Sequence, residues 1–174
     1  MNDYVLDARL GFSVRQGFGR VRGSFDTVEG SLTVEADDPS TASVELTFRA
    51  DSIQTRNKRR DDHLRRSFLA AAEHPLGTFV STEVTRVDDS VFRVTGVLTI
   101  RGVAKPMSFD LKQSEELRFE GELTLDRRDW RVVWNALAEG WGLFVAYDVR
   151  VRLDVTVTRR VSGPVAAGFE AEAQ

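Results

Sequence analysis

The chain has 174 residues, of which 41% are hydrophobic, and its formal net charge at pH 7 is −3. This length favours one domain with a sizeable core, and the slightly negative charge gives no general drive toward nucleic acid. The sequence holds no cysteine and two histidines, which excludes disulfide scaffolds, thiolate nucleophiles and Cys- or His-rich metal sites. No apolar run approaches the roughly 20 residues of a membrane-spanning helix. Because the first residues also lack a signal-peptide pattern, we expect a cytoplasmic protein without a transmembrane segment.

The dominant pattern along the chain is the alternation of apolar and polar side chains, which is typical of strands with one buried face. Glycines inside the second of these patterns indicate bulges or sharp bends. In chain order, the alternation predicts strands at 4–15, 18–35, 42–50, 78–87, 91–100, 107–111, 117–125 and 145–157.

Residues 57–74 break this pattern, because they are charged, rich in alanine and do not alternate. Leu64 and Phe68 fall at helical spacing, and a proline directly follows the segment. We therefore expect a short helical insertion around these residues. The Gly-, Ala- and Glu-rich stretch 162–174 is expected to be a flexible tail, which leaves 1–161 as a single domain.

About eight amphipathic strands must close or fold on themselves to bury one apolar face. An extended eight-stranded antiparallel β-barrel does this and removes open edges, with a two-sheet sandwich as the alternative all-β architecture. The interior of such a barrel is either filled by side chains or holds one small ligand. Because the inward-facing pattern here is rich in Phe, Val and Leu, any ligand is expected to be apolar.

The densest charged segment is 56–68. Within it, Asp61 and His63 are spaced so that the carboxylate could orient a general base, and the arginines could hold a phosphate or a carboxylate. The alternative is a solvated helix with internal salt bridges. No nucleophile elbow, P-loop or dinucleotide fingerprint accompanies the pair, so we expect no catalytic residues, no metal site and no cofactor.

The three tryptophans, Trp130, Trp134 and Trp141, lie within 12 positions of one another. Tryptophan favours places with one apolar end and one wet end. The cluster therefore predicts either the mouth of a cavity or a membrane-facing rim. The alternative is that these rings plug one end of the barrel.

Four further patterns occur in a fixed order along the chain. Gly-Phe-Gly-x-Val-x-Gly-x-Phe stands at 17–25, and Asp-Arg-x-Asp-Trp stands at 126–130. More specific are Thr-x-Asn-x-x-Arg-Asp-x-His-Leu at 55–64 and Leu-Thr-Ile-Arg-Gly-Val-x-Lys-Pro at 98–106. With these motifs the chain resembles the YceI-like family, and the resemblance covers about residues 4–158.

The resemblance implies a lipocalin-like, eight-stranded barrel that holds a polyisoprenoid, such as an isoprenoid quinone or a polyprenyl compound, in its lumen. By alternation, the candidates that would line this lumen are Phe12, Val14, Phe25, Val44, Leu46, Phe48, Phe92, Val94, Leu98, Ile100 and Phe109. The candidates for the mouth, where the polar head of the ligand would lie, are Arg60, Asp61, His63, Phe68, Trp130 and Trp134.

Three functions therefore compete. The first is a carrier that binds an isoprenoid-type lipid, and the second is a structural or interaction barrel with a filled lumen. The third is an enzyme that acts on a hydrophobic substrate with His63 as its acid or base. The resemblance also implies a possible homodimer, to which an apolar face around Phe68 and Leu69 would contribute if it is exposed. If that face is buried, it instead plugs the barrel.

Overall fold

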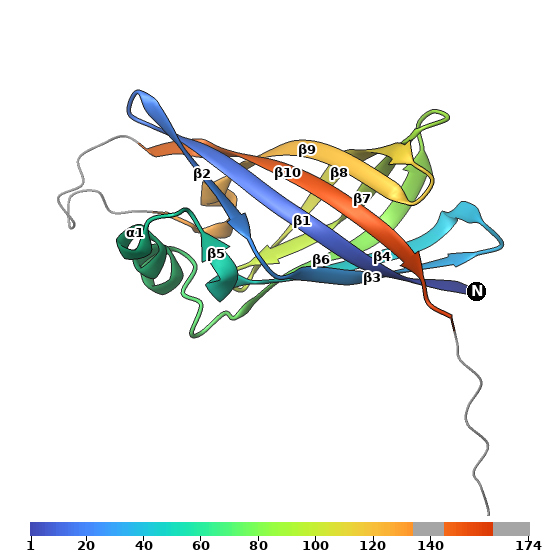
Figure 1. Cartoon of the computed structure of the whole chain (residues 1–174), viewed down its shortest axis with the longest axis horizontal. Helices are drawn as coiled ribbons and strands as arrows, with labels where there is room; N and C mark the ends of the chain where they lie inside the picture. Colours follow the sequence, from blue (N-terminus) through green and yellow to red (C-terminus); the bar gives the residue numbers. More distant parts are fainter. Residues whose placement is uncertain (134–144, 162–174) are drawn as a thin grey trace, which may run out of the picture.

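The computed structural model describes residues 1–133 and 145–161, and every structural statement below concerns these residues (Figure 1). The strands are β1 (Asn2–Gln16), β2 (Gly19–Phe25), β3 (Val28–Glu35), β4 (Asp38–Arg49), β5 (Ile53–Gln54), β6 (Leu76–Arg86), β7 (Val91–Ile100), β8 (Val103–Glu115), β9 (Arg118–Asp126) and β10 (Val145–Arg159). The helical elements are the 3₁₀ turns η1 (Ala50–Ser52) and η3 (Arg127–Trp130), the helix α1 (Lys58–His63) and the π-helical turn η2 (Leu64–Phe68).

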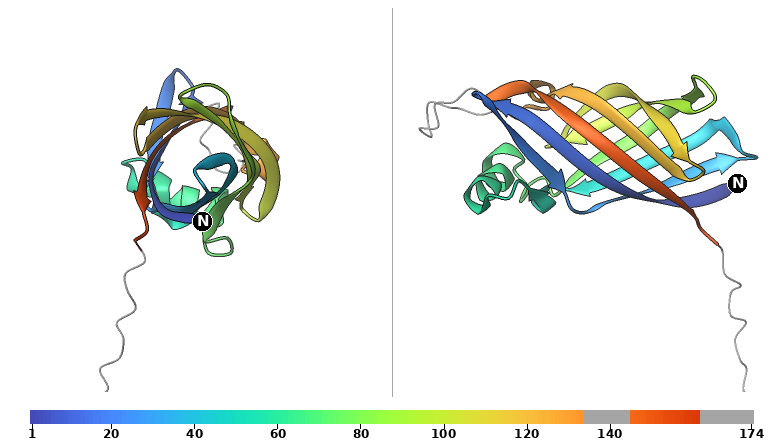
Figure 2. Two further views of the ribbon diagram at one scale, coloured as in Figure 1. Left: turned by 90° about the vertical axis from the view of Figure 1, so that its right-hand side faces the viewer. Right: turned by 45° about the horizontal axis from the view of Figure 1, so that its top comes forward.

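All strand pairs are antiparallel, and the sheet closes on itself because β10 pairs with β1. This closing pair is long and extends from Tyr4↔Arg159 to Val14↔Val149. The strands encircle a common axis when the molecule is viewed end-on (Figure 2, left). The predicted all-β fold, an eight-stranded antiparallel barrel with a short helical insertion, is therefore confirmed.

Ten strand segments form eight barrel strands, because two strands are bent. β2 and β3 pair with different halves of the same strand, β1, and β5 continues β4 after the turn η1. At the bend between β2 and β3, the amides of Asp26 and Thr27 donate to the backbone and side-chain oxygens of Ser52. The single strand predicted at 18–35 is thus divided at this bend, where Ser52 replaces the missing ladder partner.

The insertion is shorter than predicted, since α1 and η2 together cover 58–68. They lie at one end of the barrel, beside β2 and β5, while the N-terminus lies at the opposite end (Figure 1). Among the described residues, no helix is long and apolar enough to cross a bilayer. The predicted tail, 162–174, lies outside the described residues.

The core is continuous along the barrel and is closest-packed toward the end that carries the N-terminus. Val94, at 2% exposure, is its most buried member, and Leu6, Val84, Val155 and Val157 belong to the same cluster. Large rings in this core lie over glycines of neighbouring strands. An ideal Cβ on Gly77 would lie 2.0 Å from Cζ of Phe48, so only glycine leaves room for that ring.

Gly77→Ala is expected to lower the free energy of unfolding by about 1–3 kcal/mol, because the new methyl group overlaps the Phe48 ring. Urea denaturation monitored by tryptophan fluorescence measures this change. Gly11→Ala is the matched control, since its Cβ would meet nothing closer than the Gly23 carbonyl oxygen at 3.8 Å. Equal stabilities of the two variants would contradict the packing argument.

Candidate functional site

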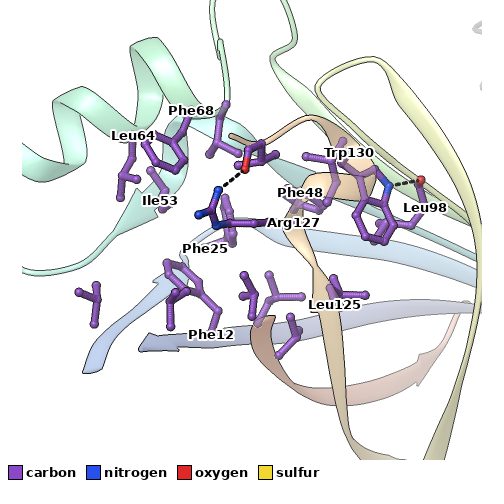
Figure 3. Close-up of a pocket in the computed structure, with 18 of the residues that line it drawn as sticks. Phe12, Phe25, Phe48, Ile53, Leu64, Phe68, Leu98, Leu125, Arg127 and Trp130 are labelled. Atoms are coloured by element: carbon purple, nitrogen blue, oxygen red, sulfur yellow. Dashed lines mark hydrogen bonds between the residues drawn. The ribbon is translucent and has the colours of Figure 1, made fainter. Parts of the chain in front are cut away.

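One end of the barrel is hollow and encloses a cavity of about 610 Å³ (Figure 3). Its wall is made mostly of apolar side chains from the inner faces of the strands, and α1, η2 and η3 surround the entrance. Among the labelled residues in Figure 3, Phe12, Phe25 and Phe48 come from three different strands and face the same space. The described chain therefore contains a ligand-sized apolar cavity, and the lumen is not filled along its whole length.

The floor of the cavity is formed by the rings of Phe79 and Phe109, whose centroids lie 5.2 Å apart with the planes inclined by 61°. Phe79 projects over Gly96 of β7, where a Cβ would come within 2.7 Å of the ring. Below this pair the core is filled, beginning with Val94. Two aromatic side chains thus separate the hollow half of the barrel from the packed half.

The structure divides the predicted lumen residues into two groups. Three of them, Val44, Phe92 and Val94, do not line the cavity, because they lie in the packed half. Phe92, for instance, packs against the Phe119 ring at 5.9 Å between centroids. The residues that do line the cavity are Phe12, Val14, Phe25, Leu46, Phe48, Leu98, Ile100 and Phe109.

The helical insertion is held against the barrel by its own apolar side chains. The Asn57 side chain caps α1 by accepting from the Arg60 amide at 3.0 Å, and the Leu69 amide donates to the Leu64 carbonyl across the π-helical turn. Phe68 and Leu69 are 7% and 8% exposed and belong to one buried cluster with Ala50 and Ile53. The face around Phe68 and Leu69 therefore packs onto the barrel, and the homodimer stays a prediction.

A buried hydrogen-bond network joins the insertion to the strand before it. Asp61 is 5% exposed, and it accepts from the Thr55 amide at 3.0 and 3.2 Å and also from the Thr55 hydroxyl. Arg60 donates from Nε to the same hydroxyl at 2.7 Å and from Nη2 to the Thr55 carbonyl at 2.8 Å. Thr55 thus forms hydrogen bonds with both the Asp61 carboxylate and the Arg60 guanidinium. These bonds explain why threonine, arginine and aspartate occur together in the motif at 55–64.

This network decides the geometry of the predicted Asp61 and His63 pair. The Asp61 carboxylate is directed at Thr55 and does not line the cavity, whereas Arg60 and His63 do. The His63 ring packs edge-on against Phe68, with 5.8 Å between centroids. Asp61 therefore fixes the strand beside the cavity entrance through its hydrogen bonds to Thr55.

The second part of the entrance is η3, which carries Arg127 and Trp130 into the barrel. Trp130 is 4% exposed, lines the cavity, and donates from Nε1 to the Leu98 carbonyl at 2.9 Å, so it ties η3 to β7 (Figure 3). Trp130 thus lines the cavity and also fills space at this end of the barrel. The predicted mouth residue Trp134, like Trp141, lies outside the described residues.

Arg127 lines the cavity although it is only 9% exposed. It donates to the backbone carbonyls of Ala146 at 3.0 Å, Val132 at 2.8 Å and Val145 at 3.1 Å. Burial lowers the pKa of its guanidinium, which nevertheless remains charged because the ordinary value is so high. The motif at 126–130 contained this residue, but only the structure shows that it points inward.

No group of three His, Asp or Glu side chains suited to a metal ion occurs among residues 1–133 and 145–161. The polar residues around the cavity are nearly all at its entrance, where they are arginines, His63, Asn57 and Gln16. A closed antiparallel barrel with one apolar cavity and a polar entrance defines the class of lipocalin-like barrels. The chain belongs to the YceI-like family, since the model of the YceI-like domain matches residues 4–157.

Curated relatives are similar to this chain over much of its length. A UPF0312 protein of Pseudomonas aeruginosa is 34% identical over 146 residues, which are 75% of this chain and 76% of the relative. A UPF0312 protein of Pectobacterium carotovorum is 39% identical over 97 residues, or 55% of this chain. In that second match the chain spans about half the length of the relative, 50%.

Solved structures share the fold at low sequence identity. BcnA of Burkholderia cenocepacia superposes with a TM-score of 0.76 at 21% identity, covering 87% of this chain and 96% of that one. A Saccharophagus degradans domain, described as a polyisoprenoid-binding domain implicated in plant cell wall breakdown, gives a TM-score of 0.73 at 15% identity. It covers 90% of this chain and 98% of that domain. These likenesses establish the extended barrel fold.

Acid is expected to weaken η3 through Asp126. Its carboxylate accepts from the Arg128 side chain and amide, and these bonds lower its pKa from 3.8 to about 2. Because the folded pKa is the lower one, this stabilisation is present above about pH 4 and is lost as the pH falls toward 2. Asp126→Asn should therefore be less stable than the wild type at pH 6, and the difference should shrink toward pH 2.

Chemical denaturation at a series of pH values measures this difference. Asp129→Asn is the matched control, because it removes the same charge from an exposed neighbour on the same turn. If the difference in the free energy of unfolding between the wild type and Asp126→Asn stays constant from pH 6 to pH 2, the stabilisation does not come from the ionised Asp126 carboxylate.

Proposed function

We propose that this protein is a carrier that binds an isoprenoid-type lipid, such as an isoprenoid quinone or a polyprenyl compound, with its apolar chain in the barrel. The observation that carries the proposal is the cavity of about 610 Å³ with an apolar wall and polar groups gathered at its entrance. Ligand sites in proteins are commonly of this size and of this character. The description of the structurally similar Saccharophagus degradans domain as polyisoprenoid-binding supports the same class of ligand.

In this proposal the eight predicted lumen residues that line the cavity contact the apolar chain, and burial of that chain provides the affinity. Each Å² of apolar surface removed from water contributes about 25 cal/mol, from which the loss of ligand freedom is subtracted. Arg60, His63, Phe68 and Trp130 lie where the polar head of the ligand would enter. Asp61 does not contact the ligand in this proposal; it holds Thr55, which in turn accepts a hydrogen bond from Arg60.

The two other functions fit the structure less well. A purely structural barrel would fill its lumen with side chains, whereas the hollow half of this barrel is larger than many drug-sized sites. An enzyme that uses His63 as a base would need a group to orient the imidazole. The Asp61 carboxylate, which the sequence suggested for that role, is bound to Thr55.

Native mass spectrometry of the purified protein, followed by organic extraction, tests the proposal directly. We expect a co-purified lipid, or binding of an added isoprenoid quinone or polyprenyl compound. Failure to carry any lipid and to bind any of these added compounds would overturn the carrier function.

Val149→Trp is expected to weaken lipid binding at least tenfold, which corresponds to about 1.4 kcal/mol. Val149 lies on the inner face of β10 and lines the cavity, so a larger ring there occupies the space of the ligand. Arg150→Trp is the matched control, because the next residue on the same strand is exposed on the outer face. Titration of both variants with the same quinone measures the effect, and equal affinities would place the ligand elsewhere.

A further inference from the structure

The charged side chains that line the cavity in the described part of the chain all have the same sign. Among the described residues that line it, four are arginines, one is histidine, and none is an aspartate or a glutamate. The four arginines are Arg59, Arg60, Arg66 and Arg127. This is unexpected for a chain with a net charge of −3, because the cavity wall is positive while the protein as a whole is negative.

The carboxylates next to the entrance are bound to other groups. Asp61 is buried and accepts from Thr55, Asp62 pairs with Arg65 at 3.2 Å, and Asp126 pairs with Arg128 at 2.6 Å. These three carboxylates do not line the cavity. Among the described residues, these three carboxylates therefore form no ion pair with Arg60, Arg66 or Arg127.

Arg127 is the most buried of the four arginines, so its charge is largely removed from water. Its hydrogen-bond partners among the described residues are three backbone carbonyls, which use three of its five N–H groups, and its Cζ lies 5.1 Å from the centroid of the uncharged Tyr147 ring. Its guanidinium points from η3 toward the side of the cavity that carries Ile53 and Leu64 (Figure 3). A cation in a largely apolar wall is stabilised strongly by an anion and only weakly by a neutral group.

Arg60 and Arg66 line the same cavity from the helical insertion. Arg60 is half-buried and fixed by two hydrogen bonds to Thr55, so its orientation is established before a ligand arrives. Arg66 is exposed, and its Nε donates at 3.3 Å to the Asp62 backbone carbonyl. One side of the entrance thus presents an ordered guanidinium and a movable one, which suits a phosphate or carboxylate.

We propose that the ligand of this cavity is an anionic amphiphile, an apolar chain that ends in a phosphate or a carboxylate, bound in preference to a neutral lipid with the same chain. This inference rests on the proposed lipid-carrier function and names its ligand class. Arg60, Arg66 and Arg127 bind the anion at the entrance, and the apolar wall takes the chain.

Titration with geranylgeranyl monophosphate and with geranylgeraniol, which share one chain, tests the preference. We expect the phosphate to bind at least tenfold more tightly than the alcohol. Palmitic acid and hexadecanol form a second pair that distinguishes a carboxylate ligand from a phosphate ligand. Tighter binding of either anion supports the proposal, whereas equal affinities within both pairs overturn it and leave the carrier function intact. If neither member of either pair binds and no isoprenoid quinone binds, the carrier function itself fails.

Arg60→Gln and Arg66→Gln should each reduce the affinity for the anion severalfold more than the affinity for the alcohol. Glutamine at position 60 can still donate to Thr55, so the network behind the entrance is retained. Arg152→Gln is the control, because it removes the same charge from the exposed outer face of β10. An equal loss in all three variants would overturn the assignment of the anion site.

A separate observation, the aromatic floor, limits the length of the chain. On β10 the cavity wall runs from Val145 to Leu153, which at about 3.3 Å per residue and a strand tilt of about 40° gives a depth of about 20 Å. A prenyl chain advances by about 5 Å per unit, since each unit adds four bonds of about 1.5 Å. We infer that the cavity takes about four isoprene units, and that Phe79 and Phe109 stop a longer chain.

Prenyl monophosphates of increasing length test this limit. The affinity should rise from geranyl to geranylgeranyl and should not rise further for octaprenyl, whose end cannot be buried. Phe109→Ala should move the optimum to longer chains, whereas Phe92→Ala, a truncation in the packed half, should leave it unchanged. Tighter binding of the octaprenyl compound by the wild type would overturn the inference.

Discussion

The structure depends on the pairing of β1 with β10, which joins the two ends of the sheet. The sheet has one apolar face, and that face is shielded from water only if the strands close around it. Twelve register pairs between the first and last strands achieve this, beginning at Tyr4↔Arg159. The cavity, its floor and its entrance all lie within the space that this closure defines, so the site forms only when both ends of the chain are in place.

Inside the closed barrel, the size of the inward side chains decides where space remains. In the packed half, rings and branched side chains interdigitate. At the cavity, Gly77 and Gly96 leave room for the rings of Phe48 and Phe79 from neighbouring strands. In the hollow half, the inward side chains do not meet across the barrel axis, and a cavity of about 610 Å³ results. The Phe79 and Phe109 pair is the boundary between these two regimes.

The entrance is built by side chains that bond to the backbone. Arg127 binds three carbonyls, Trp130 binds the Leu98 carbonyl, and Arg60 binds Thr55. The β8–β9 ladder extends only from Lys112↔Glu120 to Glu115↔Arg118, at the end away from the entrance. η3 follows β9, and the hydrogen bond from Trp130 to the Leu98 carbonyl joins it to β7 where β8 and β9 are no longer paired. The same turn carries Arg127, so a cation lies in the apolar wall.

The sequence by itself determined the strands, their faces and the helical interruption, because a period of two and its loss at 57–74 are local properties of the chain. The number of amphipathic strands then favoured a closed barrel over a two-sheet sandwich, and the structure confirms the barrel. Motifs shared with the YceI-like family pointed to the same fold, and the alternation selected eight of the residues that line the cavity.

Only the tertiary structure decided the depth of each residue along the barrel. Alternation places Val94 and Leu98 on the same inner face, yet the first is core and the second lines the cavity, since rings from other strands fill the space beside Val94. The partner of Asp61 and the inward direction of Arg127 likewise depend on groups brought near by folding. Register and long-range packing set these contacts, and neither leaves a periodic signal in the sequence.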